Sequence, residues 1–424
     1  MLLIAVLAAG GCGPSKQQIA VNRAIEAYFA GDYAAAQQKL MEAAKKPDEN
    51  FVLNNLRLGS AALARYDLDT AEEAFLRAYE VINSVGVNAG GRTLGAIFVD
   101  EKIKIWKGEP FERAMANFYL GLIYDMRQDY ANARAAFENA LFKLRDYADK
   151  NDARDQYAEQ ESNFVIGLMM LGRTWQKLGR DDLARASFDR VRELRPHLAP
   201  LVDEQRNATS NLLLVVEFGH GPQKVTDFDG SIVGFAPSPA EAGAIPPPRV
   251  TIDGQPVNLE GLTEPPIDLL AMAQDRRWQS IDTIRAIKSA VGSGLIVGGA
   301  GATVYGANRG REDTALAGLA MIGTGLLLKA TSQADVRQWE MLPRTVFILP
   351  LRVPPGTHEL TISFPHAGPG LHQTWRGIVV PSHGQATYYM RLQRWTSGTY
   401  TWPPAHDELS KPAPASPGAN PTTH

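Results

Sequence analysis

The chain has 424 residues, of which 45% are hydrophobic and 21% charged, and its formal net charge is −3. This length is too great for one ordinary core and predicts two or three domains. The near-neutral charge argues against a nucleic-acid partner. The single cysteine excludes an intramolecular disulfide and a cysteine-based zinc site.

Residues 1–12, MLLIAVLAAGGC, predict a lipoprotein signal peptide. An apolar run ends in Ala-Gly-Gly directly before the only cysteine, Cys12. This is the order of a lipobox, whose small side chains admit a signal peptidase and whose thiol accepts a diacylglyceryl group. We therefore expect a lipid anchor at Cys12. Because Gly13 rather than Asp follows, we expect the outer membrane, on its periplasmic side, as the location.

Residues 13–207 contain a helical repeat. A glycine is followed twelve residues later by an alanine and four residues after that by a bulky residue, with a weaker first copy around Ala36 and Leu40. The three full copies are Gly59, Ala71, Phe75; Gly121, Ala133, Phe137; and Gly172, Ala184, Phe188. These are the spacings of tetratricopeptide repeats, in which the glycine lets paired helices approach and the bulky residue fills the groove. They predict an all-α solenoid whose concave face binds a peptide or protein.

Residues 208–395 predict a small antiparallel β domain. Its strands include the runs NLLLVVEFG, RTVFILPLRV and QATYYMRLQ, which are rich in β-branched and aromatic residues. A Gly-rich helical insert, 265–338, interrupts this domain. The Pro-rich segment 396–424 predicts a disordered tail. The fold class expected for the whole chain is therefore α+β.

The insert contains two apolar runs joined by the charged turn NRGRED, and its spacing does not match a phosphate-binding loop. We interpret residues 289–328 as a helical hairpin packed on the β domain or on a second copy of the chain. The alternative is a membrane-inserting or oligomeric pore-like subunit. The uncharged run 289–308 has about the length of a bilayer span, but the run 314–328 is short for one.

No catalytic, cofactor-binding or metal-binding residue emerges from the motifs. The histidines are not paired at helical spacing, and no Ser-His-Asp constellation follows from chain order. We expect a non-enzymatic protein without a cofactor, a metal or a small-molecule substrate. An envelope hydrolase is a further hypothesis, which would require a converging polar cluster.

The stretch KGEPFER predicts a helix start after the repeat array is interrupted at residues 82–105. Pro110 suits the first helical turn, where its missing N–H would have no partner. Glu112 complements the positive end of the helix dipole. Gly108 lets the chain turn into the helix.

The remaining residues of this stretch are Trp106, Lys107, Glu109 and Arg113. We predict that they contact a partner if they line the concave face beside the interruption. If they are buried instead, we expect them to have a structural role alone.

Three motifs together resemble an uncharacterised family of bacterial tetratricopeptide-repeat lipoproteins. They are the lipobox, the K-G-E-P-x-E-R element at 107–113, and the A-D-x-R-x-W-x-x-L-P element at 334–343. The resemblance covers most of residues 12–365. It implies a lipid-anchored envelope scaffold that binds envelope proteins or itself, sometimes linked with outer-membrane or cell-wall assembly, and it implies no catalytic residue.

Overall fold

The computed structural model describes residues 15–83, 105–142, 163–207, 209–226, 232–238, 241, 243–259, 262–275, 278–279, 283, 335–364, 372–393 and 398–400. Cys12, the predicted hairpin 289–328 and residues 84–104 of the interrupting loop lie outside these ranges.

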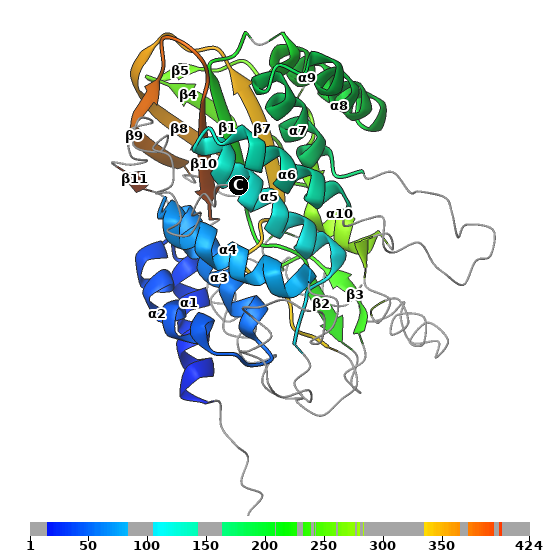
Figure 1. Cartoon of the computed structure of the whole chain (residues 1–424). Coiled ribbons are helices and arrows are strands. Elements are labelled where there is room, and N and C mark those ends of the chain that lie inside the picture. Colours follow the sequence, from blue (N-terminus) through cyan, green and yellow to red (C-terminus); the bar gives the residue numbers. More distant parts are fainter. Residues whose placement is uncertain are drawn as a thin grey trace, which may run out of the picture.

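The first half of the chain folds into successive antiparallel helix pairs, which confirms the predicted helical repeats. Figure 1 shows the helices following one another in a curved row beside strands β1, β7 and β10. The helices are α1 (Lys16–Phe29), α2 (Tyr33–Lys45), α3 (Phe51–Ala64), α4 (Leu68–Asn83), α5 (Pro110–Met126), α6 (Tyr130–Phe142), α7 (Val165–Lys177), α8 (Asp181–Leu194) and α9 (Ala199–Arg206).

The repeat residues pack as their spacing predicts. A Cβ atom placed on the repeat glycine would lie 2.6–2.7 Å from a phenylalanine ring of the paired helix, in the pairs Gly59–Phe75, Gly121–Phe137 and Gly172–Phe188. In the first helix pair Ala24 stands at the glycine position, and the smaller Leu40 replaces phenylalanine; both are completely buried. The close approach of each helix pair therefore depends on one small residue facing one large one.

The second half of the chain forms β-sheets. The strands are β1 (Leu212–Phe218), β2 (Gln223–Thr226), β3 (Ile232–Ala236), β4 (Arg249–Ile252), β5 (Gln255–Pro256), β6 (Ile267–Asp268), β7 (Thr345–Leu351), β8 (Gly356–Ser363), β9 (His372–Val380), β10 (Ala386–Leu392) and β11 (Gly398–Tyr400). Their order is β10-β1-β7-β6 in one sheet and β11-β9-β8-β4-β5 in a second, with β2-β3 as a separate pair.

Not all of these strands are antiparallel, which corrects the predicted sheet type. Strand β1 pairs in parallel with β10, and β9 pairs in parallel with β11. Parallel neighbours need a long crossover rather than a hairpin. Here the first parallel pair joins the start of the β region to its end.

The described elements form three layers, with the sheet containing β1 in the middle. Helices α3 and α5 pack on β10, and α7 packs on β7. On the other face, the ring of Phe218 stacks on Phe364, which directly follows β8 of the second sheet, with centroids 4.1 Å apart. Every residue of β1, β7 and β10 is buried. Burial on both faces explains why these strands read as continuous apolar runs.

Two predicted boundaries are wrong. The helical insert was expected from residue 265, but Ile267–Asp268 forms strand β6 on β7, and the helix that follows, α10, is short (Leu269–Gln274). The tail was expected to be disordered from residue 396, but Gly398–Tyr400 pairs with β9. Both segments gain their conformation from a distant strand, so their local composition does not reveal it.

Candidate functional site

The concave face of the helical array holds strand β10 of the same chain. The Tyr66 hydroxyl donates to the carbonyl oxygen of Tyr389 at 2.7 Å and accepts from its backbone N–H at 2.8 Å. The Tyr33 hydroxyl donates to the carbonyl oxygen of Arg391 at 3.1 Å. These bonds cover the outer edge of β10, whose backbone groups would otherwise be unpaired.

Buried charged groups also connect the helices to the sheet that contains β10. Arg173 on α7 pairs with Asp125 on α5, and both bond Thr387 on β10, at 3.0 Å for Arg173 and 2.8 Å for Asp125. Arg57 on α3 donates to Glu340 at 2.9 Å. Removing one member of such a buried pair costs about 3–5 kcal/mol, because the other charge is left without compensation.

A buried carboxylate lies in the middle of this contact. Glu217 on β1 is fully buried, and its Oε2 accepts a hydrogen bond of 2.7 Å from the Tyr389 hydroxyl. Burial raises the pKa of Glu217, although Arg391, whose Nε is 4.0 Å away, opposes the shift. The concave face is thus an interface within the chain. This corrects the expectation that it is open to another protein.

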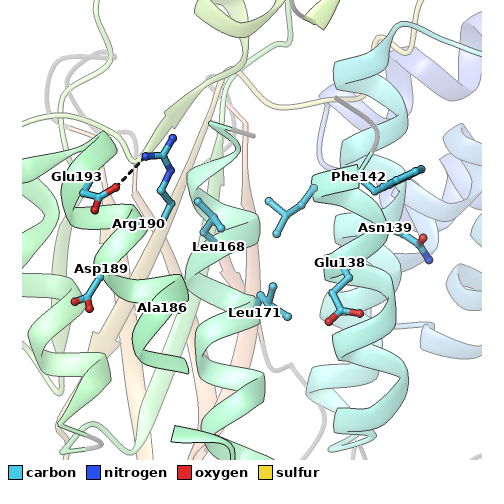
Figure 2. Close-up of a pocket in the computed structure, with 10 residues that line it drawn as sticks. Glu138, Asn139, Phe142, Leu168, Leu171, Ala186, Asp189, Arg190 and Glu193 are labelled. Carbon is cyan, nitrogen blue, oxygen red and sulfur yellow. Dashed lines mark hydrogen bonds and ion pairs between the residues drawn. The ribbon is translucent and has the colours of Figure 1, made fainter. Parts of the chain in front are cut away.

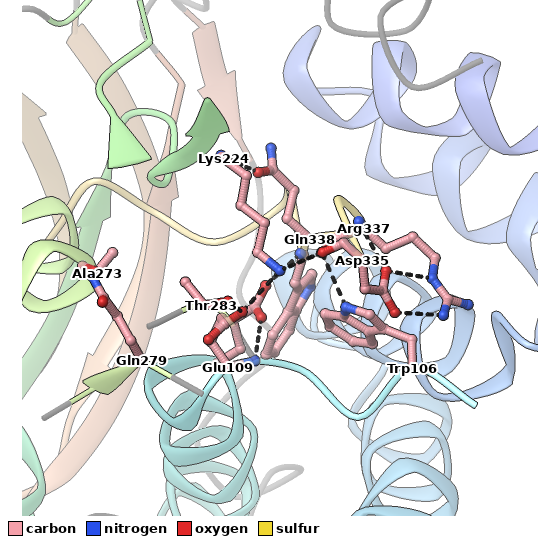
Figure 3. A network of polar contacts seen from close by, with 11 residues as sticks. Trp106, Glu109, Lys224, Ala273, Gln279, Thr283, Asp335, Arg337 and Gln338 are labelled. Carbon is pink, nitrogen blue, oxygen red and sulfur yellow. Dashed lines mark hydrogen bonds and ion pairs between the residues drawn. The ribbon is translucent and has the colours of Figure 1, made fainter. Parts of the chain in front are cut away.

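The residues predicted to contact a partner lie where four chain segments meet (Figure 3). Trp106 is 3% exposed, and its Nε1 donates to the carbonyl oxygen of Arg337 at 3.0 Å. Glu109, also buried, has its Oε1 at 2.9 Å from Lys224 Nζ and accepts from the Thr283 hydroxyl at 2.7 Å. Both side chains therefore contact residues of their own chain, which favours the structural role for them.

Lys107 and Arg113, the other two predicted contact residues, are half-buried. Burial is the main cause that lowers the pKa of Lys107, and the nearby charge of Arg113 adds to it. These two remain accessible, but they do not line an open concave surface.

The start of α5 confirms the helix start that the sequence predicted, and Glu112 makes one contact that was not predicted. Pro110 occupies the first turn, and Gly108 has φ +77°. Glu112 accepts from the backbone N–H of Glu109 at 2.6 Å through Oε2, and from the N–H of Trp339 at 2.6 Å through Oε1. Burial is the main cause that raises the pKa of Glu112, to about 7.

Sequence reasoning did not find Lys224. Its backbone N–H donates to the Gln338 side chain at 2.6 Å, and its Nζ donates to the carbonyl oxygens of Asp335 at 3.0 Å and Arg337 at 3.1 Å. One lysine in a short strand has no characteristic spacing. Its importance comes from the segment 335–338, which lies more than a hundred residues further along the chain.

An open groove lies between α6 and α8 over α7 (Figure 2). It has a volume of about 860 Å³. Its apolar surface comes from Leu141, Phe142, Leu168 and Leu171, and its charged rim from Glu138, Asp189, Arg190 and Glu193. Phe142 is 46% exposed, a large fraction for a phenylalanine. The sequence does not reveal this groove, because Phe142 directly follows the apolar residues of α6 and therefore resembles one more core residue.

One histidine and carboxylate pair is buried apart from these features. His220 Nδ1 lies 3.0 Å from Glu241 Oε1, and the His220 ring stacks on Phe29 with centroids 4.3 Å apart. In the part of the chain that the structure describes, no group of three His, Cys, Asp or Glu side chains is placed to hold a metal ion. Within the same residues, no helix has the length and apolar character needed to cross a membrane.

Comparison with known proteins adds little to this picture. No family model matches the chain, and no curated protein matches it. A solved structure described as the crystal structure of MamA is similar over 43% of this chain and 81% of that chain, with 15% sequence identity and a TM-score of 0.30. The repeats are defined by the helix pairs of this chain and their glycine–phenylalanine packing.

Proposed function

We propose that the protein is a non-enzymatic scaffold of the cell envelope that binds other proteins through its helical repeats. The observation that carries this proposal is the open groove between α6 and α8, with Phe142 exposed beside it. Helical repeats commonly bind partners on their extended surfaces. Because strand β10 occupies the concave face, we assign partner binding to this groove on the outer side of the array.

The lining of the groove suggests the chemistry of the partner. Three carboxylates and one guanidinium line it, around the leucines and Phe142. Exposed apolar surface with a charged rim is typical of a protein-binding site. The proposed ligand is a polypeptide segment that inserts apolar side chains beside Phe142.

Lipid anchorage at Cys12 and a periplasmic location at the outer membrane belong to the same proposal. They are supported by the lipobox sequence before Cys12. A single acyl chain holds a protein weakly, whereas several chains on one cysteine anchor it stably. The repeats would then present the groove to envelope proteins, including those that assemble the outer membrane or cell wall.

Photo-crosslinking in whole cells tests the groove. A crosslinking amino acid replaces Asn139, which also lines the groove. Adducts with another protein are compared in the parent chain, with Phe142→Asp, and with Ile19→Asp as the matched control. Ile19 is 37% exposed on α1, at the other end of the array. Neither exposed position should affect folding greatly, and thermal unfolding of both variants checks this.

We expect Phe142→Asp to abolish the adduct, since it places a charge on the apolar surface, and Ile19→Asp to retain it. An adduct that forms equally well in both variants would show that the groove is not the binding site.

A further inference from the structure

His358, near the start of β8, has both of its ring nitrogens at hydrogen-bond distance from oxygen atoms. Nδ1 lies 2.7 Å from Oδ2 of Asp253, in the turn between β4 and β5, and Nε2 lies 2.7 Å from the carbonyl oxygen of Pro354, in the loop after β7. The His358 side chain is 11% exposed. Asp253 precedes His358 by 105 residues, so the ring connects two turns that are far apart in the chain.

The backbone fixes the positions of both groups. Asp253 and Gly254 form the two-residue turn of the β4–β5 hairpin, with φ +51° and +77°, as an Asp-Gly turn of type I′ requires. The Asp253 N–H donates to the carbonyl oxygen of Glu359 at 2.8 Å, and Asp253 Oδ1 accepts from the Glu359 N–H at 2.9 Å. The register between β8 and β9 shifts between His358 and Glu359, and such a bulge changes the direction of the side chains beside it. The turn is thus held against β8 next to the His358 ring.

Both oxygen atoms that face the ring act as hydrogen-bond acceptors. The Pro354 oxygen is a backbone carbonyl, which cannot donate. The backbone N–H of Glu359 and the His358 ring both bond the carboxylate of Asp253 and hold its pKa below the ordinary value, so this carboxylate is ionised and accepts as well. A neutral imidazole has one N–H and could serve only one of the two oxygens, whereas an imidazolium donates from both nitrogens. The two distances of 2.7 Å therefore fit the protonated ring.

Other charged side chains lie on the elements around the ring. They are Glu359 on β8, Arg376 on β9, Glu204 on α9 and Arg352 in the loop after β7. Glu359 is paired with Arg376, whose Nε lies 2.8 Å from Glu359 Oε2. Among the described residues, Asp253 is therefore the carboxylate that bonds the His358 ring.

Asp253, Pro354 and His358 are part of the wall of a cavity with a volume of about 620 Å³, which lies between α9, the β4–β5 hairpin and the end of β7. Its apolar lining includes Leu201, Ile252, Val257, Leu351 and Val353. A volume of this size is typical of small-molecule pockets. The two hydrogen bonds of the His358 ring therefore fix one side of a cavity that is large enough for a ligand.

We propose that His358 is an acid-stabilised clip, which in its imidazolium form holds the β4–β5 turn on the loop after β7 and so fixes this part of the cavity wall. When the ring releases its proton to solvent, one nitrogen becomes an acceptor that faces another acceptor, and one of the two bonds is lost. The turn and the loop then separate, and the cavity changes shape. Because the clipped arrangement needs the proton, falling pH favours it and rising pH removes it.

Two measurements on the full chain test the clip between pH 5.5 and pH 8.5. Nuclear magnetic resonance of the histidine rings reports their protonation, and His358→Gln assigns the His358 signal. Hydrogen–deuterium exchange of a peptide covering 356–362, corrected for the intrinsic exchange rate, reports the attachment of the turn, because the Glu359 N–H bonds Asp253. We expect an imidazolium ring at pH 5.5 and a loss of protection of about two- to fivefold as the ring becomes neutral, the range for a partly exposed ion pair. A peptide from β1 should change much less.

Asp253→Asn is the informative variant, because its amide nitrogen can donate to a neutral ring while its oxygen still accepts from the Glu359 N–H. Asparagine also tolerates the positive φ of this position. The clip then no longer needs a proton, so we expect the 356–362 peptide of this variant to keep its protection at pH 8.5. The exposed change His383→Gln is the matched control and should respond to pH like the wild type.

Equal protection of the wild type at both pH values would overturn the proposal, as would a change in protection that does not follow the deprotonation of His358. A full loss of protection at pH 8.5 in Asp253→Asn would overturn it as well. The wild-type measurements decide the question even if Asp253→Asn folds poorly.

Discussion

In three helix pairs of the array, a phenylalanine ring packs directly against a glycine of the paired helix. At Gly121 an added Cβ would lie 2.6 Å from Phe137, closer than nonbonded carbons approach. Phe137 itself is completely buried, so its ring has no free space to move into. One hydrogen in place of a methyl group thus sets how closely α5 and α6 can pack.

Gly121→Ala should destabilise the protein. Overpacking costs about 1–3 kcal/mol, and the better helix propensity of alanine returns about 1 kcal/mol. We expect a net loss of up to about 2 kcal/mol in the free energy of unfolding. Urea denaturation followed by circular dichroism measures it.

The double variant Gly121→Ala with Phe137→Leu is the control, because it reproduces the alanine and leucine combination of Ala24 and Leu40 in the first helix pair. It should lose less stability than the sum of the two single variants. Additive losses would show that the two positions do not interact in this way.

Among the elements, strand β10 depends most clearly on the helices. Among the described strands it pairs with β1 alone, and Tyr66 and Tyr33 bond backbone groups of its other edge. Tyr66 follows α3 with φ +64°, an unusual conformation for a side chain of this size. The turn between α3 and α4 thus positions the Tyr66 hydroxyl to bond the edge strand β10.

Tyr66→Phe removes the hydroxyl that bonds both backbone groups of Tyr389. Each buried backbone group left without a partner costs about 1–3 kcal/mol. We therefore expect a loss of about 2–6 kcal/mol in the free energy of unfolding, with faster amide exchange in β10. Chemical denaturation and hydrogen exchange measure the two effects.

Tyr79→Phe is the matched control. The Tyr79 hydroxyl accepts a weak bond of 3.3 Å from Asn139 in a half-buried position. Its loss should cost no more than about 0.5 kcal/mol. Similar losses for Tyr66→Phe and Tyr79→Phe would argue against the edge-holding role of Tyr66.

At the scale of the whole molecule, the helical array and the sheets are joined by buried side-chain contacts. Strands β1, β7 and β10 have no exposed residue, because the helices and the second sheet cover them. The buried contacts of Arg173, Arg57 and Tyr66 all cross from helix to sheet. Among the described residues, the surface left for a partner is therefore the outside of this body.

Cys12→Ala tests how the whole molecule is attached to the membrane. The wild-type chain should remain in the membrane fraction after carbonate extraction, and the variant should move to the soluble fraction, because it lacks the acyl chains. Immunoblotting of both fractions measures the distribution. A variant that stays in the membrane would contradict anchorage through Cys12 alone and would favour membrane insertion of residues 289–328.

Local patterns in the sequence predicted a large part of the fold. The spacing of Gly121, Ala133 and Phe137 located a helix pair, and the apolar run before Glu217 located β1. These features are encoded by neighbours in the chain, so their periodicity can be read directly.

The sequence by itself determined the helix pairs and the central strands β1, β7 and β10, since hydrophobic period and small-to-large spacing depend on residues within a few turns of each other. Only the tertiary structure decided that β10 lies parallel to β1 and fills the concave face, and that Glu109 and Glu112 meet Lys224 and Trp339. The bond between Tyr66 and Tyr389 joins positions 323 residues apart. Contacts over such separations depend on how completed elements pack, and they leave no periodic signal in the chain.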